Sequence, residues 1–144
     1  MTATLRAQFA DYAAHHGTPG NRLCHSVGIP LIVLTSFGLL SRVGLFAVGG
    51  YTVTLAEVVL VGATLYYLTL DAPLAGMMAV ASGVLLLLGR ALPFWAALGL
   101  FVLGWVLQFI GHYVYEKRSP AFFRNLAHLL VGPLWILAKA TGRT

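Results

Sequence analysis

The chain has 144 residues, of which 59% are hydrophobic and only 9% are charged, and its net charge is +5. A soluble domain carries about 25% charged residues, so nine basic and four acidic side chains cannot cover a soluble globule of this size. The composition therefore excludes an ordinary soluble protein and a disordered one. The basic residues are scattered between apolar runs, which argues against nucleic-acid binding. The single cysteine, Cys24, excludes a disulfide framework and a cysteine-based zinc site.

The first segment, Met1–His16, contains Arg6 and Asp11 and lacks the compact apolar core of a secretory signal. Four of its apolar residues share one helical stripe, namely Leu5, Phe9, Tyr12 and Ala13. We expect a short amphipathic helix that lies at the membrane surface. The turn cluster at residues 18–21 follows, and Asn21 is the predicted N-cap of the next helix.

The remaining chain is divided into apolar runs, and a membrane-crossing helix needs about 20 such residues. Three runs meet this requirement, Leu23–Leu40, Ala72–Gly89 and Phe94–Tyr115, and Thr52–Leu70 meets it if Glu57 is tolerated near one end. The last run, Ala121–Ala138, is interrupted by Arg124, His128 and Pro133. We expect it to begin with Ser119 as cap and Pro120 in the first turn, and to enter the membrane partway rather than as a fifth crossing.

These runs predict one all-α membrane domain over residues 1–144, with four transmembrane helices, an N-terminal interfacial helix and a partly inserted last helix. Four crossings place five basic residues on one side, Arg6, Arg22, Lys117, Arg118 and Arg124, and two on the other, Arg42 and Arg90. The positive-inside rule then puts both chain ends in the cytoplasm. Short loops and the lack of a targeting segment favour a bacterial inner membrane.

The five histidines are His15, His16, His25, His112 and His128. An even number of crossings returns the chain to the membrane face that it left. His25, about 6 Å into the first span, and His112, one turn before the fourth span ends, are therefore expected at similar depth on that face. His15 and His16 lie just before the first span, and His128 is expected about 12 Å into the last helix.

Ionisable groups at membrane depth are rare and indicate function. A single histidine near an interface is more often a hydrogen-bonded structural residue. Three histidines at a similar depth in the membrane favour a metal site, because neutral imidazole binds iron, zinc and copper. Three imidazoles also leave coordination positions open, which is typical of a catalytic metal.

Two acidic residues have two interpretations each. Glu116 shares a helix face with His112 at a spacing of four residues. It either orients that imidazole or pairs with Lys117, Arg118 or a phospholipid amine. Glu57 either serves a proton or substrate path or forms local hydrogen bonds, and we favour the local bonds.

Two segments resemble a known family. The first is Tyr12-x3-His16-x2-Pro19-x-Asn21-x3-His25-x4-Pro30, and the second is Trp105-x2-Gln108-Phe109-x-Gly111-His112-x3-Glu116-Lys117-Arg118-x-Pro120-Ala121, followed by Asn125-Leu126 and Pro133. Both are similar to the small multispanning 2-hydroxy fatty acid dioxygenases. The resemblance covers most of the chain, although residues 40–100 match only as apolar spans.

The resemblance implies an Fe(II)-dependent dioxygenase that uses O2 to shorten a long-chain 2-hydroxy fatty acid by one carbon. It implies that His16, His25 and His112 bind the metal and that Asn21, Gln108 and Glu116 support catalysis. The chain departs from the family pattern at His128, where the family has a polar amide, and at Lys139, where it has an acidic residue. These departures leave the role of the last helix open.

Other classes of protein remain as alternatives. Di-iron hydroxylases and desaturases need clustered histidine boxes that five histidines cannot supply. A zinc-dependent membrane lipid hydrolase is compatible with three histidines, and a heme protein with two that face each other. A non-enzymatic scaffold or transporter subunit would leave the histidines without a common ligand. The substrate chain length, an aldehyde or acid product and the oligomeric state do not follow from the sequence.

Overall fold

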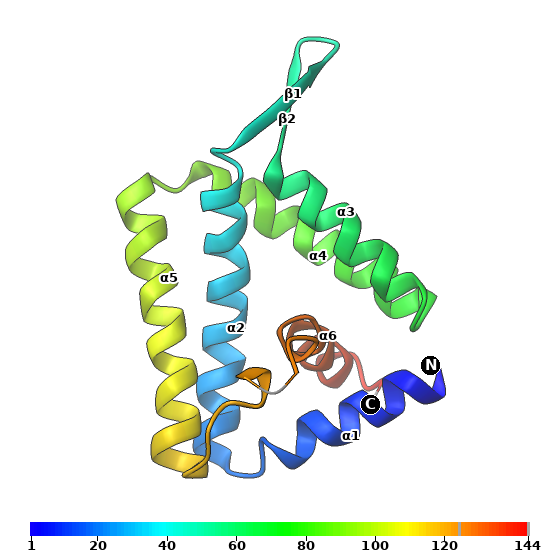
Figure 1. Cartoon of the computed structure of the whole chain (residues 1–144), viewed down its shortest axis with the longest axis vertical. Helices are drawn as coiled ribbons and strands as arrows, with labels where there is room; N and C mark the ends of the chain where they lie inside the picture. Colours follow the sequence, from blue (N-terminus) through cyan, green and yellow to red (C-terminus); the bar gives the residue numbers. More distant parts are fainter. Residues whose placement is uncertain (124, 144) are drawn as a thin grey trace. The chain divides into compact units, whose positions relative to one another are not determined.

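The computed structural model describes residues 1–123 and 125–143, and most of them are helical. In chain order the elements are α1 (Ala3–Ala14), α2 (Pro19–Leu40), β1 (Gly44–Val48), β2 (Tyr51–Thr54), α3 (Leu55–Leu68), α4 (Ala72–Ala91), α5 (Phe94–Phe109), the π-helix η1 (Ile110–Glu116), the 3-10 helix η2 (Ala121–Phe123) and α6 (His128–Ala140) (Figure 1). The chain forms two compact units, Met1–Pro30 with Leu103–Thr144 and Leu31–Val102. The prediction of a mainly helical protein is confirmed, and the structure also contains one β-hairpin.

In the unit made from the two ends of the chain, α1 packs against α6. Helix α1 begins where the Thr2 hydroxyl accepts a hydrogen bond from the Leu5 backbone N–H at 3.2 Å. Leu5, Phe9 and Tyr12 are buried as the stripe predicts, whereas Ala13 is exposed. On α6, Val131 and Leu134 are fully buried. The N-terminal segment thus has a packed apolar face.

Helix α2 begins at Pro19, two residues before the predicted cap. The capping group is the Thr18 hydroxyl, which accepts a hydrogen bond from the Asn21 backbone N–H at 3.3 Å. The prediction of Asn21 as N-cap is therefore wrong. Proline fits the first helical position because its missing N–H would have no partner there. Asn21 consequently lies within the first turn of α2.

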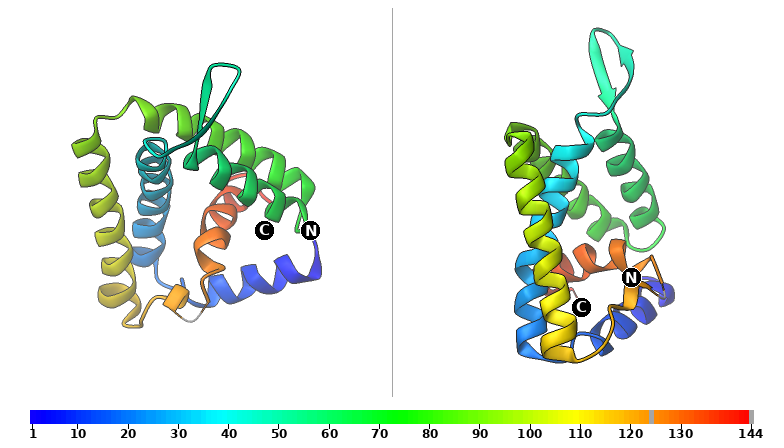
Figure 2. Two further views of the ribbon diagram at one scale, coloured as in Figure 1. Left: turned by 45° about the horizontal axis from the view of Figure 1, so that its top comes forward. Right: turned by 60° about the vertical axis from the view of Figure 1, so that its left-hand side comes forward.

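The first part of α2 packs closely on the end of α5 and on η1, and both views in Figure 2 show these segments side by side. Glycines permit the approach. A Cβ on Gly28 would collide with the Gln108 amide nitrogen, and a Cβ on Gly111 would collide with the Asn21 side-chain oxygen. Close helix packing of this kind is common in membrane proteins. It brings the polar residues of α2 next to those of η1.

The second unit contains an unpredicted antiparallel hairpin of β1 and β2. Its turn is Gly49-Gly50, with φ of 55° and 82°, which glycine adopts without steric cost. The expected Thr52–Leu70 span is wrong in its first residues, because these belong to β2 and α3 has only 14 residues. That length is about 21 Å, which is less than the hydrocarbon core of about 30 Å.

Helix α3 packs against α4 (Figure 1). Glu57 lies in the first turn of α3, and its contacts there decide between its two interpretations. The Glu57 carboxylate accepts hydrogen bonds of 2.8 Å from the Thr54 backbone N–H and from the Tyr51 hydroxyl. It also forms an ion pair with Arg90. The preference for local hydrogen bonds at Glu57 is thus confirmed. Asp71 caps α4 by accepting a hydrogen bond from the Leu74 N–H at 3.0 Å.

Among the described residues, three helices are long and apolar enough to cross a membrane: Pro19–Leu40, Ala72–Ala91 and the continuous Phe94–Glu116. Helices α3 and α6 are apolar but shorter. The apolar helices are those of a membrane protein, and the predicted total of four crossings is not confirmed.

The last helix begins at His128, so the predicted start at Ser119 and Pro120 is wrong. Only the short 3-10 helix η2 follows Pro120 directly. His128 accordingly lies at the first residue of α6 rather than about 12 Å inside a helix. Arg124, one of the basic residues used to predict the orientation, lies outside the described residues.

Candidate metal centre

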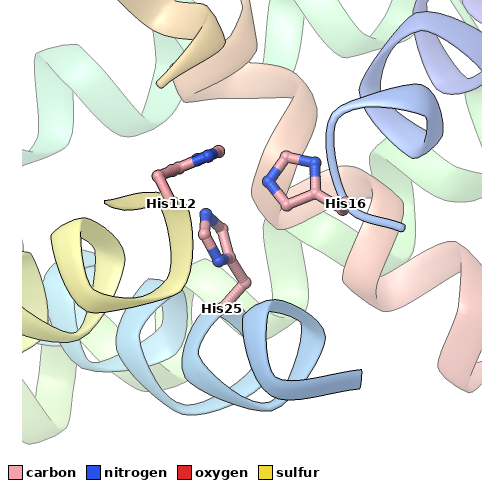
Figure 3. Close-up of side chains that lie close together, drawn as sticks. All are labelled: His16, His25 and His112. Atoms are coloured by element: carbon pink, nitrogen blue, oxygen red, sulfur yellow. The ribbon is translucent and has the colours of Figure 1, made fainter. Parts of the chain in front are cut away.

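Three histidines from three separate elements converge in the unit formed by the chain ends (Figure 3). His16 lies in the loop after α1, His25 lies in α2 and His112 lies in η1. Their ring centroids are 4.3 Å (His16–His25), 4.7 Å (His25–His112) and 5.1 Å (His16–His112) apart. Each offers a ring nitrogen within 4.8 Å of the others, and all three side chains are buried.

Backbone hydrogen bonds orient two of these rings. The Nδ1 atom of His16 lies 2.6 Å from the Tyr12 carbonyl oxygen, and that of His25 lies 3.0 Å from the Asn21 carbonyl oxygen. A carbonyl oxygen only accepts, so each Nδ1 carries the hydrogen and each Nε2 keeps a free lone pair. The His16 Nε2 atom is buried and has no hydrogen-bond partner among the described residues. This is the pattern of metal-binding histidines.

The three nitrogens fit a metal ion. Bonds of about 2.0–2.1 Å in tetrahedral geometry place ligand nitrogens about 3.4 Å apart. The three ring nitrogens lie within 4.8 Å of one another, so they must draw closer to bind one ion. Burial lowers the pKa of His16 to about 4, because water no longer solvates the charged imidazolium. His16 is therefore neutral at pH 7, as a metal ligand must be. Three buried histidines of this chain could thus hold a metal ion.

His112 lies in η1, which is a π-helix. A π-helix inserts extra residues into a helix and frequently occurs at functional sites. It ends at Lys117, which has a left-handed conformation with φ of 53°. At the same end, the Glu116 carboxylate accepts hydrogen bonds from the Thr18 N–H at 2.7 Å and from the Thr18 hydroxyl at 3.1 Å. Glu116 thus connects the helix of His112 to the loop of His16.

Asn21 and Gln108 lie one helical turn before His25 and His112 respectively, and both are buried. The Asn21 amide nitrogen donates to the His15 carbonyl oxygen at 3.2 Å. Its Oδ1 atom and the Gln108 Nε2 atom have no hydrogen-bond partner in the described part of the chain. An unpaired buried polar atom costs about 1–3 kcal/mol. Each side chain therefore has one buried polar atom whose hydrogen-bonding capacity is unused among the described residues.

The other two histidines lie outside the three-histidine group and share a partner. His128 Nε2 lies 2.8 Å from the Asp11 carboxylate, and His15 Nδ1 lies 2.9 Å from the Asp11 carbonyl oxygen. Neither the contacts of Asp11 nor the stacking of the Tyr12 ring on His16 was predicted from the sequence. The spacing of four residues between Tyr12 and His16 was the available signal for this stack, since such residues are neighbours on a helix.

Buried imidazoles that could hold a metal, in a chain with helices long and apolar enough to span a bilayer, define a helical membrane protein with a candidate metal centre. The chain belongs to the family described as "2-hydroxy-palmitic acid dioxygenase Mpo1-like", which matches residues 2–144. It is 36% identical over 138 residues to the 2-hydroxy-palmitic acid dioxygenase MPO1 of Saccharomyces cerevisiae, covering 92% of this chain and 77% of the relative. No solved structure matches the chain. The family predicted from the two sequence segments is confirmed.

Proposed function

We propose that the protein is an Fe(II)-dependent dioxygenase that shortens long-chain 2-hydroxy fatty acids by one carbon. The observation that carries this proposal is the convergence of three buried imidazoles in a member of this family. The named activity of the yeast relative supports the substrate class. The predicted orientation places the site at the cytoplasmic face of a bacterial inner membrane.

His16, His25 and His112 would hold the iron through one ring nitrogen each, which leaves coordination positions for the substrate and O2. Bound ferrous iron supplies the one-electron chemistry that triplet O2 requires. The carboxylate and 2-hydroxyl of the substrate would form a chelating pair for that iron and would thereby hold the α-carbon within the site. The net change, R–CHOH–COOH + O2 → R–COOH + CO2 + H2O, balances without an outside reductant. An aldehyde product would instead be accompanied by CO2 and hydrogen peroxide.

The protein's own residues then bind and orient the substrate. The unpaired Gln108 Nε2 atom could donate a hydrogen bond to its carboxylate, and the unpaired Asn21 Oδ1 atom could accept one from its hydroxyl. Glu116 keeps the His16 loop and η1 together through Thr18. Arg22, Lys117 and Arg118 would attract the carboxylate to the membrane face, while the acyl tail lies among the apolar helices.

The test uses metal-stripped protein in detergent, reloaded with Fe(II) or Zn(II) and given O2 with 2-hydroxypalmitate or palmitate. We expect a product one carbon shorter from 2-hydroxypalmitate with Fe(II) alone. Palmitate offers only its carboxylate and should remain unchanged. Equal turnover of both acids would contradict the chelation. The alternative, a zinc-dependent membrane lipid hydrolase, is tested by giving the iron-free zinc form a lipid ester or amide, and hydrolysis of that lipid would establish it.

A further inference from the structure

We propose that Asp11 and His128 are positioning residues for the metal ligand His16. They hold the first turn of α6 against α1, and α6 in turn holds the Tyr12 ring that fixes the His16 imidazole. This inference rests on the proposed metal centre and adds to it the last helix, whose role the sequence left open.

His16 is the ligand that most needs such support. His25 and His112 project from helices, whereas His16 lies in the loop between α1 and α2. Tyr12 constrains it in two ways. The two rings stack with centroids 3.9 Å apart and planes inclined by 15°, and the Tyr12 carbonyl oxygen accepts the His16 Nδ1–H at 2.6 Å. One residue of α1 thus sets both the plane of the imidazole and the nitrogen that faces the metal.

Tyr12 is itself confined by one face of α6. Its ring centroid is 5.2 Å from that of Trp135 and 5.9 Å from that of His128. Between these two residues, a Cβ added to Gly132 would lie 3.2 Å from the Tyr12 hydroxyl oxygen. His128, Gly132 and Trp135 follow the spacing of a single helix face. A shift of α6 would therefore release the Tyr12 ring and with it the plane of His16.

The contact between His128 and Asp11 fixes the start of that face. His128 is the first residue of α6, and its Nε2 atom lies 2.8 Å from the Asp11 carboxylate. Asp11 directly precedes Tyr12 in α1. The His128 side chain is 5% exposed and that of Asp11 is 53% exposed, so the contact lies at the edge of the α1–α6 interface. Its loss would let the first turn of α6 move away from α1.

The experiment measures Co(II) binding by the full-length protein in detergent, using the visible absorption bands that report the number and geometry of the ligands. Asp11→Ala and His128→Leu remove the contact from opposite sides, and Asp11→Ala changes a half-exposed residue, so it preserves the fold. We expect each to weaken Co(II) binding about 10-fold, the lower end for outer-sphere partners of metal ligands, and to alter the spectrum. The double variant should be no weaker than either single variant.

Two further variants separate positioning from a general effect on folding. His128→Gln retains an amide that can donate to Asp11 and should restore Co(II) affinity and spectrum. Thr141→Ala removes a hydroxyl that, within the described part of the chain, donates to the Leu137 and Ala138 carbonyl oxygens of α6 at 2.9 and 3.2 Å, and should change neither. If the contact has a purely structural role, Asp11→Ala and His128→Leu will unfold at a lower temperature but bind Co(II) as the unaltered protein does. This result would overturn the inference.

His16→Ala distinguishes failure of this inference from failure of the proposed function. If His16→Ala loses Co(II) binding while Asp11→Ala and His128→Leu keep it, the metal centre stands and the positioning role is wrong. If His16→Ala binds Co(II) as the unaltered protein does, the proposed metal centre is wrong and the positioning role falls with it.

Discussion

Glu116 and Thr18, 98 positions apart in the sequence, are joined by two hydrogen bonds to one carboxylate oxygen. The contact has an energetic advantage over two neutral bonds, because bonds to an ionised group are stronger. Thr18 also caps α2 through its hydroxyl. One residue pair therefore joins three features of the site: the loop of His16, the start of α2 and the end of η1.

Substitution of Glu116 should therefore weaken the site in proportion to what remains of this contact. Glu116→Gln keeps an acceptor oxygen but loses the charge, and we expect turnover to fall about 10–100-fold. Glu116→Ala loses both hydrogen bonds and should be lower still. Thr18→Ser, which retains the hydroxyl, provides the control for Thr18→Val, which does not. Equal turnover of Gln and Ala variants would show that the carboxylate oxygen's contact to Thr18 is unimportant.

The adjacent histidines His15 and His16 offer a matched pair for metal analysis. Both make a bond from Nδ1 to a carbonyl oxygen four residues earlier, but only His16 belongs to the three-histidine group. We expect His16→Ala, His25→Ala and His112→Ala to lose bound metal and His15→Ala to retain it. Elemental analysis of protein purified from cells supplied with iron measures this. Equal metal loss from His15→Ala would place the ion elsewhere.

Gly111→Ala should disrupt the site without removing any polar group. The added Cβ would collide with the Asn21 oxygen and lie 3.1 Å from the His25 Nδ1 atom, so the Asn21 side chain must shift or α2 and η1 must move apart. Gly99→Ala on α5 is the control, because a Cβ there has open space. We expect strong loss of Co(II) binding for Gly111→Ala alone. The test is a Co(II) titration of both purified variants. Identical Co(II) affinities would contradict the close approach of α2 and η1.

Gly132→Ala tests the packing of α6 on Tyr12 separately. The new Cβ would lie 3.2 Å from the Tyr12 hydroxyl and 3.0 Å from Ile29 Cδ1, closer than an ordinary contact. The Tyr12 ring must shift slightly, so we expect weaker Co(II) binding with little change in the unfolding temperature. Spectral bands and affinity that match those of the unaltered protein would mean that the ring tolerates this displacement.

The predicted membrane orientation is tested at the hairpin. A reporter inserted at Gly49-Gly50 lies in an exposed turn, where insertion disturbs little. We expect the reporter to lie on the opposite side of the membrane from reporters at the two chain ends. A cytoplasmic signal from the hairpin would contradict both the four-crossing arrangement and the use of the basic residues to orient it.

The sequence was most informative where apolar runs were long. Three runs became helices of membrane-spanning length among the described residues. His25 and His112, which were expected at similar depth, lie with ring centroids 4.7 Å apart. The hairpin was missed because short apolar runs fit either strand or helix, although Gly49-Gly50 indicated a tight turn. The contact between Asp11 and His128 joins residues 117 positions apart, and such tertiary pairing leaves no local pattern. Thr18-Pro19 did carry a local signal for the start of α2, but the prediction of Asn21 as N-cap did not use it.

The unit that holds the three histidines is assembled from residues 1–30 and 103–144, and residues 31–102 separate these two segments in the sequence. Ribosomal synthesis therefore releases two ligands early and the third only after the whole intervening segment has emerged. Bringing such distant segments together costs entropy that increases only slowly with the length between them, so the delay is set by translation and insertion more than by chain closure. Capture of a metal by these three histidines would thus be one of the last steps of biogenesis, and any product terminated before His112 would carry only two of the three proposed ligands.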